Sequence, residues 1–395
     1  MIQTKIISFI FLIPTLVINY ITLTYLDHNN NLSVFSTSII FLFNFINISF
    51  CVSILFFGFK KSLIFILYCF FILILCDVTF EKFFNKNQTI TGDRNLGWIL
   101  KSNINLKLED KTSENKKYMI NYKTSRVEGF REYGLTDVDR EKKILVIGDS
   151  FSNAQFASNE SMFYSKIEEI FKERNLYHEW FVGGAGGYGS LQQYILLKKH
   201  LKDIDPSIVI LQFCSNDFEN NSFNLESKTI IRSQKFRRPY LINNVITKDN
   251  SFVAKIYRIL SNYSYVFNVS DMIISNMEYR KYGGYYKENV TKLDIQESIQ
   301  VTKEILYKFK NLLKPDTKVY SINCSIDNKE KKIAWLDITK NLGIIALPQP
   351  NEKLKIAERN GLDIWQRDRG HLNNLGNQIY GEAIAVEILK DLNKN

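Results

Sequence analysis

Residues 143–150 read Lys-Ile-Leu-Val-Ile-Gly-Asp-Ser, an apolar run that ends in a glycine, an acid and a serine. A short apolar run closed by turn-forming residues is typical of a strand that is buried on both faces. Further runs of this kind predict strands at 178–182, 207–213, 318–323 and 343–347. Stretches with helical spacing separate them, at 160–174, 191–204, about 294–313, about 328–341 and about 373–392. The alternation predicts an α/β fold with a doubly wound parallel sheet.

Two regions fall outside this alternation. Residues 81–140 are polar and charged, and residues 218–293 form a long insertion rich in Phe and Tyr. An insertion of this length is usually functional or a subdomain of its own. We therefore divide the chain into a membrane region at 1–80, a juxtamembrane lead-in at 81–140, and an α/β domain at 141–395 that contains the insertion.

The first 80 residues contain three runs without a charge, at 6–25, 35–59 and 62–76. Because a spanning helix needs about 20 mainly apolar residues, we predict about three transmembrane helices; whether the third run spans fully stays open. Lys5 precedes the first run, and Lys60 and Lys61 follow the second. If both runs span, these three lysines lie on the same side of the membrane. By the positive-inside rule, the N-terminus is cytoplasmic and the α/β domain lies on the outer side of the cytoplasmic membrane.

Composition narrows the function classes. The chain of 395 residues has a net charge of +10, but its Lys and Arg are scattered among Asp and Glu. Without an Arg-rich arm or a known motif, this pattern argues against nucleic-acid binding. No C-x-x-C pair or His/Cys cluster occurs, so we predict no metal site and no cofactor.

A serine and a histidine are the candidate catalytic pair. Ser150 follows the first predicted strand, where ligands of such sheets bind, and as a nucleophile it needs a nearby base. By itself the Gly-Asp-Ser sequence is more typical of an ordinary turn and helix cap. Among the four histidines, His371 is the candidate base, because Asp368 lies three residues earlier and can accept its Nδ1 proton.

Two other strand ends carry groups suited to binding an oxyanion. Asn216 follows the third strand, and its amide can donate to a developing negative charge, although an Asx turn would use the same residue. The second strand is followed by Gly-Gly-Ala-Gly-Gly-Tyr-Gly at 183–189. This glycine turn matches a dinucleotide-binding pattern, but the acidic residue expected about 20 positions later is displaced. We favour an oxyanion-binding turn.

Ser150, Gly187, Asn216 and His371, in this order after successive strands, resemble the four sequence blocks of the SGNH hydrolase superfamily, also called GDSL esterases. The resemblance covers residues 143–392 and implies a flavodoxin-like hydrolase fold. It implies Ser150 as nucleophile, His371 as base and Asp368 as its orienting partner. It also implies an oxyanion hole made by the backbone N–H groups of Ser150 and Gly187 and by the Asn216 side chain.

The chain departs from the family pattern at three positions. Phe151 replaces the usual Leu after the serine, Cys214 stands where many members have Gly, and Val182 stands where an Asn often precedes the glycines. The last difference leaves open which glycine donates to the oxyanion, with Gly184 as the alternative to Gly187.

Together, the resemblance and the apolar runs in residues 1–80 predict a membrane-anchored serine esterase that acts through an acyl-enzyme, without a cofactor. The outer location makes O-acyl or O-acetyl groups on a cell-surface glycan the expected substrate, and a lipid ester is the alternative. An acyltransferase that moves an acyl group to a polysaccharide would use the same triad. A non-catalytic glycan-binding or assembly protein is a further alternative. No protein partner is indicated.

Cys214 and Cys324 end the third and fourth predicted strands. If these strands are neighbours, a disulfide can form outside the cytoplasm. We expect two buried free thiols instead.

Overall fold

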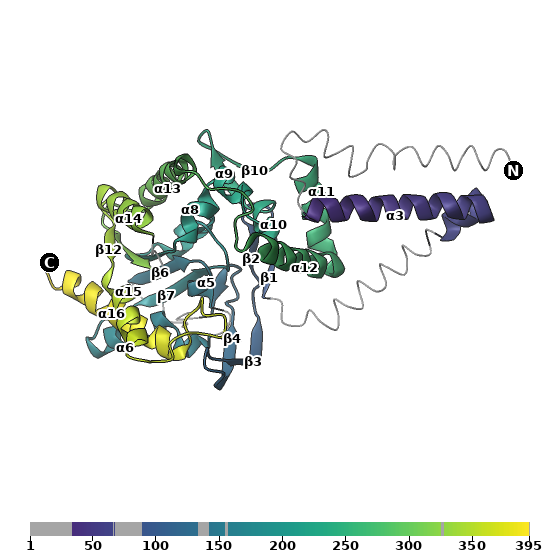
Figure 1. Cartoon of the computed structure of the whole chain (residues 1–395). Coiled ribbons are helices and arrows are strands. Elements are labelled where there is room, and N and C mark those ends of the chain that lie inside the picture. Colours follow the sequence, from purple (N-terminus) through teal and green to yellow (C-terminus); the bar gives the residue numbers. More distant parts are fainter. Residues whose placement is uncertain are drawn as a thin grey trace. The chain divides into compact units, whose positions relative to one another are not determined.

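The apolar runs predicted as strands pair in one sheet. The computed structural model describes residues 34–65, 67, 89–132, 142–154, 157–324 and 328–394. The chain divides into two units, one of Asn87–Arg258 with Glu288–Asn395 and the other of Met1–Lys86 with Ile259–Lys287. The sheet lies in the first, which we call the α/β unit (Figure 1).

The sheet of the α/β unit has the order β12-β11-β8-β6-β7-β5. Its parallel strands are β6 Lys143–Gly148, β7 Glu179–Gly184, β8 Ile208–Phe213, β11 Lys318–Asn323 and β12 Ile345–Leu347. In chain order these strands lie 2-1-3-4-5, the flavodoxin-like order of doubly wound sheets. The predicted α/β fold is confirmed. One edge strand was not predicted: β5 Phe130–Arg131 pairs antiparallel with β7, so the sheet is mixed.

Helices cover both faces of the sheet because its strands are apolar on both. In β6, Leu145 and Ile147 contribute to one hydrophobic cluster and Ile144 and Val146 to the other. The first cluster is covered by α7 Ser190–Ile204, α13 Lys292–Leu312 and α14 Lys329–Asn341. The second is covered by α6 Phe163–Glu173, α15 Gln349–Arg359 and α16 Asn374–Leu392 (Figure 1). The loops that follow the parallel strands lie at the carboxyl edge of the sheet.

Polar side chains set where several helices begin. Thr291 and Asp294 form a capping box at the start of α13, and Asn328 caps α14. Asn373 accepts from the Gly376 N–H at the start of α16. Such caps satisfy N–H groups that the first turn leaves unpaired. The last cap fixes the end of the loop that carries His371.

The lead-in from Asn87 onward and the insertion up to Arg258 belong to the α/β unit. The lead-in forms two hairpins, of β1 Ile90–Asp93 with β2 Gly97–Leu100 and β3 Asn105–Lys111 with β4 Lys117–Lys123. The short helices are α5 Ser150–Asn153, the 3-10 turn Asn159–Ser161, α8 Asn216–Asn221, α9 Phe223–Ser227 and α10 Arg232–Lys235. Strands β9 Pro239–Ile242 and β10 Val245–Lys248 form a third hairpin, and α11 Phe252–Tyr263 follows.

The other unit contains α3 Val34–Phe57 and α12 Tyr265–Tyr282. Helix α3 coincides with the second apolar run. The first run, 6–25, and most of the third, 62–76, lie outside the described residues. Among the helices that are described, none has both the length and the apolar character needed to cross a membrane.

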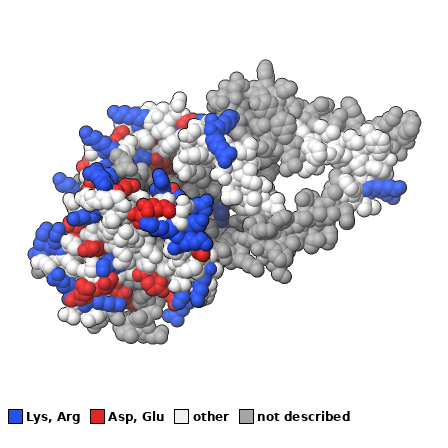
Figure 2. All heavy atoms as spheres, turned by 60° about the horizontal axis from the view of Figure 1, so that its bottom comes forward, with Lys and Arg blue, Asp and Glu red and all other residues white. Residues whose placement is uncertain are grey.

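Basic and acidic side chains are interspersed on the face of the α/β unit seen in Figure 2. The α/β unit contains exposed ion pairs, for example Lys116 with Glu114 at 2.8 Å and Lys117 with Glu109 at 2.8 Å. Exposed pairs of this kind contribute little to stability individually. The charge on this face is therefore mixed in sign.

Candidate active site

Ser150 lies at the point where β6 ends and α5 begins. Asp149 caps the helix, and its Oδ1 accepts from the Phe151 N–H at 3.0 Å. Gly148 allows the close approach of neighbouring side chains, because a Cβ there would lie 2.3 Å from Gln212 Oε1 and 2.5 Å from Ser152 Oγ. The sharp turn leaves Ser150 half-buried at the carboxyl edge of the sheet.

His371 and Asp368 lie together on the loop before α16. His371 Nε2 is 2.9 Å from Ser150 Oγ, and Nδ1 is 2.5 Å from Asp368 Oδ2. The Asp368 carboxylate also accepts from the backbone N–H groups of Gly370 at 2.9 Å and His371 at 3.1 Å. The structure thus brings the three predicted catalytic residues into one chain of hydrogen bonds, the arrangement of a Ser-His-Asp triad.

The charges around His371 favour its protonated form. Burial lowers the pKa of the imidazole, but the hydrogen bond and negative charge of Asp368, with the charge of Asp149, outweigh this and raise the pKa. Burial raises the pKa of Asp368, but the hydrogen bonds and charge that it receives from the His371 loop outweigh this and lower it. The pair therefore stabilises the protonated imidazole of His371 and the ionised carboxylate of Asp368.

Gly184, the alternative oxyanion donor, is already engaged. Its N–H donates to the Gly129 carbonyl at 3.1 Å. It also lies against β6, because a Cβ at this position would be 2.2 Å from the carbonyl oxygen of Gly148. Its role is close packing between two strand ends, and the alternative that we left open is not supported.

The next part of the glycine turn lies against Ser150. A Cβ on Gly186 would lie 3.9 Å from Ser150 Cβ. Gly187 has φ +73°, a backbone conformation that glycine adopts without strain. Within the described part of the chain, its N–H donates to no acceptor. Gly187 is therefore the better candidate for the oxyanion donor.

Asn216 is the first residue of α8, and its Nδ2 donates to Asp149 Oδ2 at 3.3 Å. This contact places the amide beside the residue that precedes Ser150. Asp149 is fully buried, and burial raises its pKa although Phe151, Gln212 and Asn216 all donate to it. One N–H of the Asn216 amide is used in this contact, and within the described residues the other donates to no acceptor.

Two supporting residues were missed in the sequence. Gln212 of β8 donates to Asp149 at 2.8 Å and accepts from Ser152, so it links the turn around Ser150 to the next strand. Its signal was a single amide in an otherwise apolar run. Asp217 accepts from the Cys214 N–H and the Ser190 hydroxyl, both at 2.8 Å, and so ties the end of β8 to the start of α7.

Cys214 and Cys324 are joined by a disulfide, with Cα atoms 5.1 Å apart. Our expectation of two free thiols is wrong, because β8 and β11 pair in a register that sets Phe213 beside Asn323. The two sulfur atoms and Asp149 form a group whose ligand atoms lie within 4.8 Å of one another. The disulfide withdraws both thiolates from metal binding.

Comparisons with known proteins give fold-level neighbours only. No family model and no curated protein matches the chain. A psychrotrophic esterase, EstA from Pseudoalteromonas sp., is 11% identical over 64% of this chain and 100% of its own, with a TM-score of 0.37. The acetyl xylan esterase AlAXEase is 13% identical over 62% and 99%, with a TM-score of 0.36. A lipase/acylhydrolase from Enterococcus faecalis is 11% identical over 62% and 95%, with a TM-score of 0.36. Likeness of this degree identifies neither an activity nor a substrate.

Proposed function

We propose that this protein is a serine hydrolase of the SGNH type that cleaves ester bonds. The observation that supports this most is the hydrogen-bonded chain from Ser150 through His371 to Asp368. It joins residues 221 positions apart at the carboxyl edge of a doubly wound sheet, where such folds bind ligands.

In the proposed acylation step, His371 Nε2 takes the proton from Ser150 Oγ as that oxygen attacks the acyl carbon. Asp368 holds the imidazole by its Nδ1–H and stabilises the charge that forms. The N–H groups of Ser150 and Gly187 and the Asn216 amide donate to the oxyanion. Each such donor typically contributes about 10²–10³ in rate. The imidazolium then protonates the leaving alkoxide, and an alcohol departs.

Deacylation reverses these roles. A water molecule gives its proton to His371 as it attacks the acyl-enzyme, and the second oxyanion is held by the same donors. Collapse of this intermediate returns the proton to Ser150 and releases a carboxylic acid. The chain's own residues thus account for every proton in both steps.

As the substrate class we propose O-acyl esters, such as O-acetyl groups, on a cell-surface glycan. This choice rests on the apolar runs in residues 1–80, which predict a membrane-anchored protein with its α/β unit outside the cytoplasmic membrane. An acyl-enzyme that forms but is not hydrolysed would point instead to transfer of the acyl group to a sugar hydroxyl.

The experiment compares turnover of aryl esters of increasing chain length by the full chain in detergent. We expect cleavage of short esters by the wild type and a fall in kcat/KM of about 10⁴-fold or more in Ser150→Ala. The matched control is Ser165→Ala on α6, whose hydroxyl donates to the Asn159 carbonyl and lies outside the site.

Equal activity in the Ser150→Ala and Ser165→Ala variants would contradict the proposal. A folded wild type that cleaves no ester, with or without a polysaccharide acceptor, would do the same and would favour a binding protein.

A further inference from the structure

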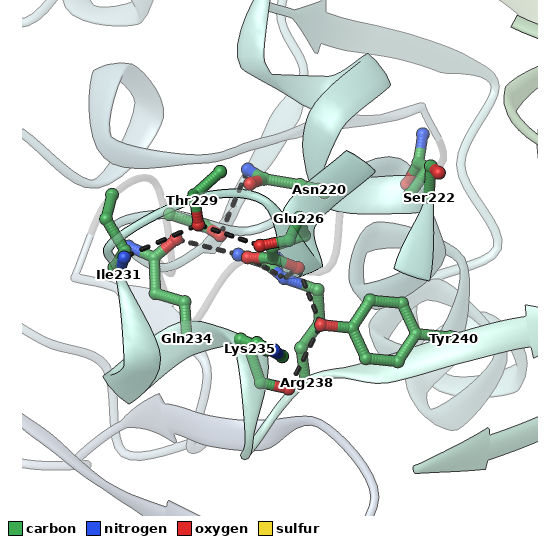
Figure 3. A network of polar contacts seen from close by, with 12 residues as sticks. Asn220, Ser222, Glu226, Thr229, Ile231, Gln234, Lys235, Arg238 and Tyr240 are labelled. Atoms are coloured by element: carbon green, nitrogen blue, oxygen red, sulfur yellow. Dashed lines mark hydrogen bonds and ion pairs between the residues drawn. The ribbon is translucent and has the colours of Figure 1, made fainter. Parts of the chain in front are cut away.

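The insertion contains a buried ion pair between Glu226 and Arg238 (Figure 3). The Arg238 side chain is 1% exposed, and its Nε donates to both carboxylate oxygens of Glu226, at 3.1 and 2.8 Å. The Tyr240 hydroxyl donates to the same carboxylate at 2.7 Å. A charge buried to this degree is retained only when it is paired and its other polar atoms are satisfied. The N–H groups on Nη1 and Nη2 of Arg238 must therefore also find acceptors.

Both remaining groups reach side chains that contact the glycine turn. Arg238 Nη2 donates to Gln234 Oε1 at 2.8 Å. The Gln234 carboxamide lies over Gly187, where a Cβ would be 2.4 Å from its Nε2. Arg238 Nη1 donates to Gln192 Oε1, which also accepts from the Gly189 N–H at 3.2 Å.

A third route runs through the lead-in. The Arg238 guanidinium lies 5.1 Å from the ring centroid of Trp98, within the range of a cation–π interaction. Trp98 Nε1 donates to the carbonyl of Gly186 at 3.0 Å. Gly186, Gly187 and Gly189 are thus each in contact with a side chain that Arg238 holds.

We propose that Arg238 is a positioning residue for the oxyanion hole: through Gln234, Gln192 and Trp98 it fixes the conformation of the glycine turn. The inference rests on the proposed function, because it assigns Arg238 a role in that reaction. In this role Arg238 acts through these three side chains and not on the reacting atoms themselves. An oxyanion donor is effective when it is held in place before the charge develops, and glycines would otherwise leave the turn free to relax.

The test separates positioning from general stability with two tryptophan variants. Trp98→Phe removes the hydrogen bond to Gly186 and keeps most of the ring. Trp335→Phe is the matched control, because its Nε1 donates to Ser321 Oγ, also at 3.0 Å, from a buried site on α14. With an aryl ester, we expect Trp98→Phe to lower kcat about 10-fold with KM nearly unchanged, and Trp335→Phe to leave kcat unchanged.

The Arg238 contacts are then tested directly. Arg238→Met alone leaves Glu226 buried without its partner and can unfold the protein, so the double variant R238M/E226M removes both charges together. Gln234→Ala tests the contact with Gly187 at a half-buried site. We expect kcat to fall about 10- to 100-fold in the double variant and less in Gln234→Ala, again with little change in KM.

Two results distinguish the inference from the function on which it rests. An active wild type whose Trp98→Phe and R238M/E226M variants keep the kcat of Trp335→Phe, or change only KM, would overturn the role of Arg238 alone. A folded wild type without ester turnover and without fluorophosphonate labelling would overturn the function and, with it, this role.

Discussion

The two sides of the candidate site are built in opposite ways. On the acid–base side, Asp368 and His371 are three residues apart on one loop, with side chains 47% and 30% exposed. On the oxyanion side, the glycine turn contacts Trp98 across 88 residues, and Arg238 behind it is 1% exposed. One side is local and open, whereas the other is assembled from distant segments and buried.

This difference separates chemistry from stability. A side chain on an exposed loop makes few packing contacts, so its loss should affect the reaction much more than the fold. A buried network supports the turn and the fold together, so its loss should affect both. Variants on the two sides should therefore differ in the ratio of lost activity to lost stability.

The largest effect is expected for His371→Ala. Loss of the base should lower kcat/KM about 10⁴-fold or more, because Ser150 is then not activated. The free energy of unfolding should change by less than about 1 kcal/mol, as for other partly exposed loop residues. Ester kinetics and urea unfolding measure the two quantities. A matched His200→Gln variant on α7 should keep full activity. A kcat/KM of His371→Ala within tenfold of wild type would contradict the expected difference between the two sides.

Asp368→Asn is expected to have the next largest effect, with a fall in kcat of about 10³- to 10⁴-fold. It should also shift the pH profile. In the wild type, the raised pKa of His371 keeps the imidazole protonated to higher pH, so activity should rise with pH through a midpoint above the ordinary value of about 6.5. Removing the Asp368 charge should move that midpoint to lower pH. An unchanged midpoint in the variant's kcat/KM profile would show that Asp368 does not set the pKa.

Gly187→Ala should affect both activity and stability. With φ +73° and Gln234 in the way of a Cβ, alanine is strained and the turn must move, so we expect kcat to fall about 10²-fold. We also expect a loss of roughly 2 kcal/mol in the free energy of unfolding. Gly343→Ala is the matched control, because its φ is +64° and a Cβ there meets nothing within 4 Å. It should lose about half as much stability and no activity. Equal losses in the two variants would show that the contact between Gly187 and Gln234 does not matter.

The smallest effect on activity is expected for the C214S/C324S double variant. The disulfide closes a loop with a sequence separation of 110 residues, so its removal should lower the free energy of unfolding by roughly 2–5 kcal/mol. It joins neither His371 nor the glycine turn, so kcat at a temperature where the variant is folded should stay within a few-fold of wild type. A larger fall would mean that the disulfide helps to position the turn around Ser150.

The acid–base side of the site could be predicted from the sequence because its residues are close together along the chain. The spacing of Asp368 and His371 is a short-range pattern, and the strand before Ser150 is a continuous apolar run, which is among the clearest signals of buried secondary structure. Both follow from neighbours along the chain. The flavodoxin-like order of the parallel strands was implied only by the SGNH resemblance, because the rules for doubly wound folds allow more than one order.

The remote side left no local pattern. Two elements elsewhere in the α/β unit were also missed, because the antiparallel strand β5 Phe130–Arg131 is too short to show a period and α15 Gln349–Arg359 has few apolar positions. Arg238 occurs in a basic stretch that resembles an ordinary solvated surface, and its burial depends on Glu226 and Tyr240 from neighbouring elements. The pairing of Cys214 with Cys324 depends on strand adjacency, which only the fold defines.

The central claim, that Ser150 is a nucleophile activated by His371, is tested most directly by locating the site of phosphonylation. The full chain is treated with a fluorophosphonate at several pH values, digested and analysed by mass spectrometry. The account predicts one adduct, on Ser150, whose rate of formation rises with pH through a midpoint above about 6.5 and which is absent in His371→Ala. An adduct on another residue, or none on the folded protein, would contradict it.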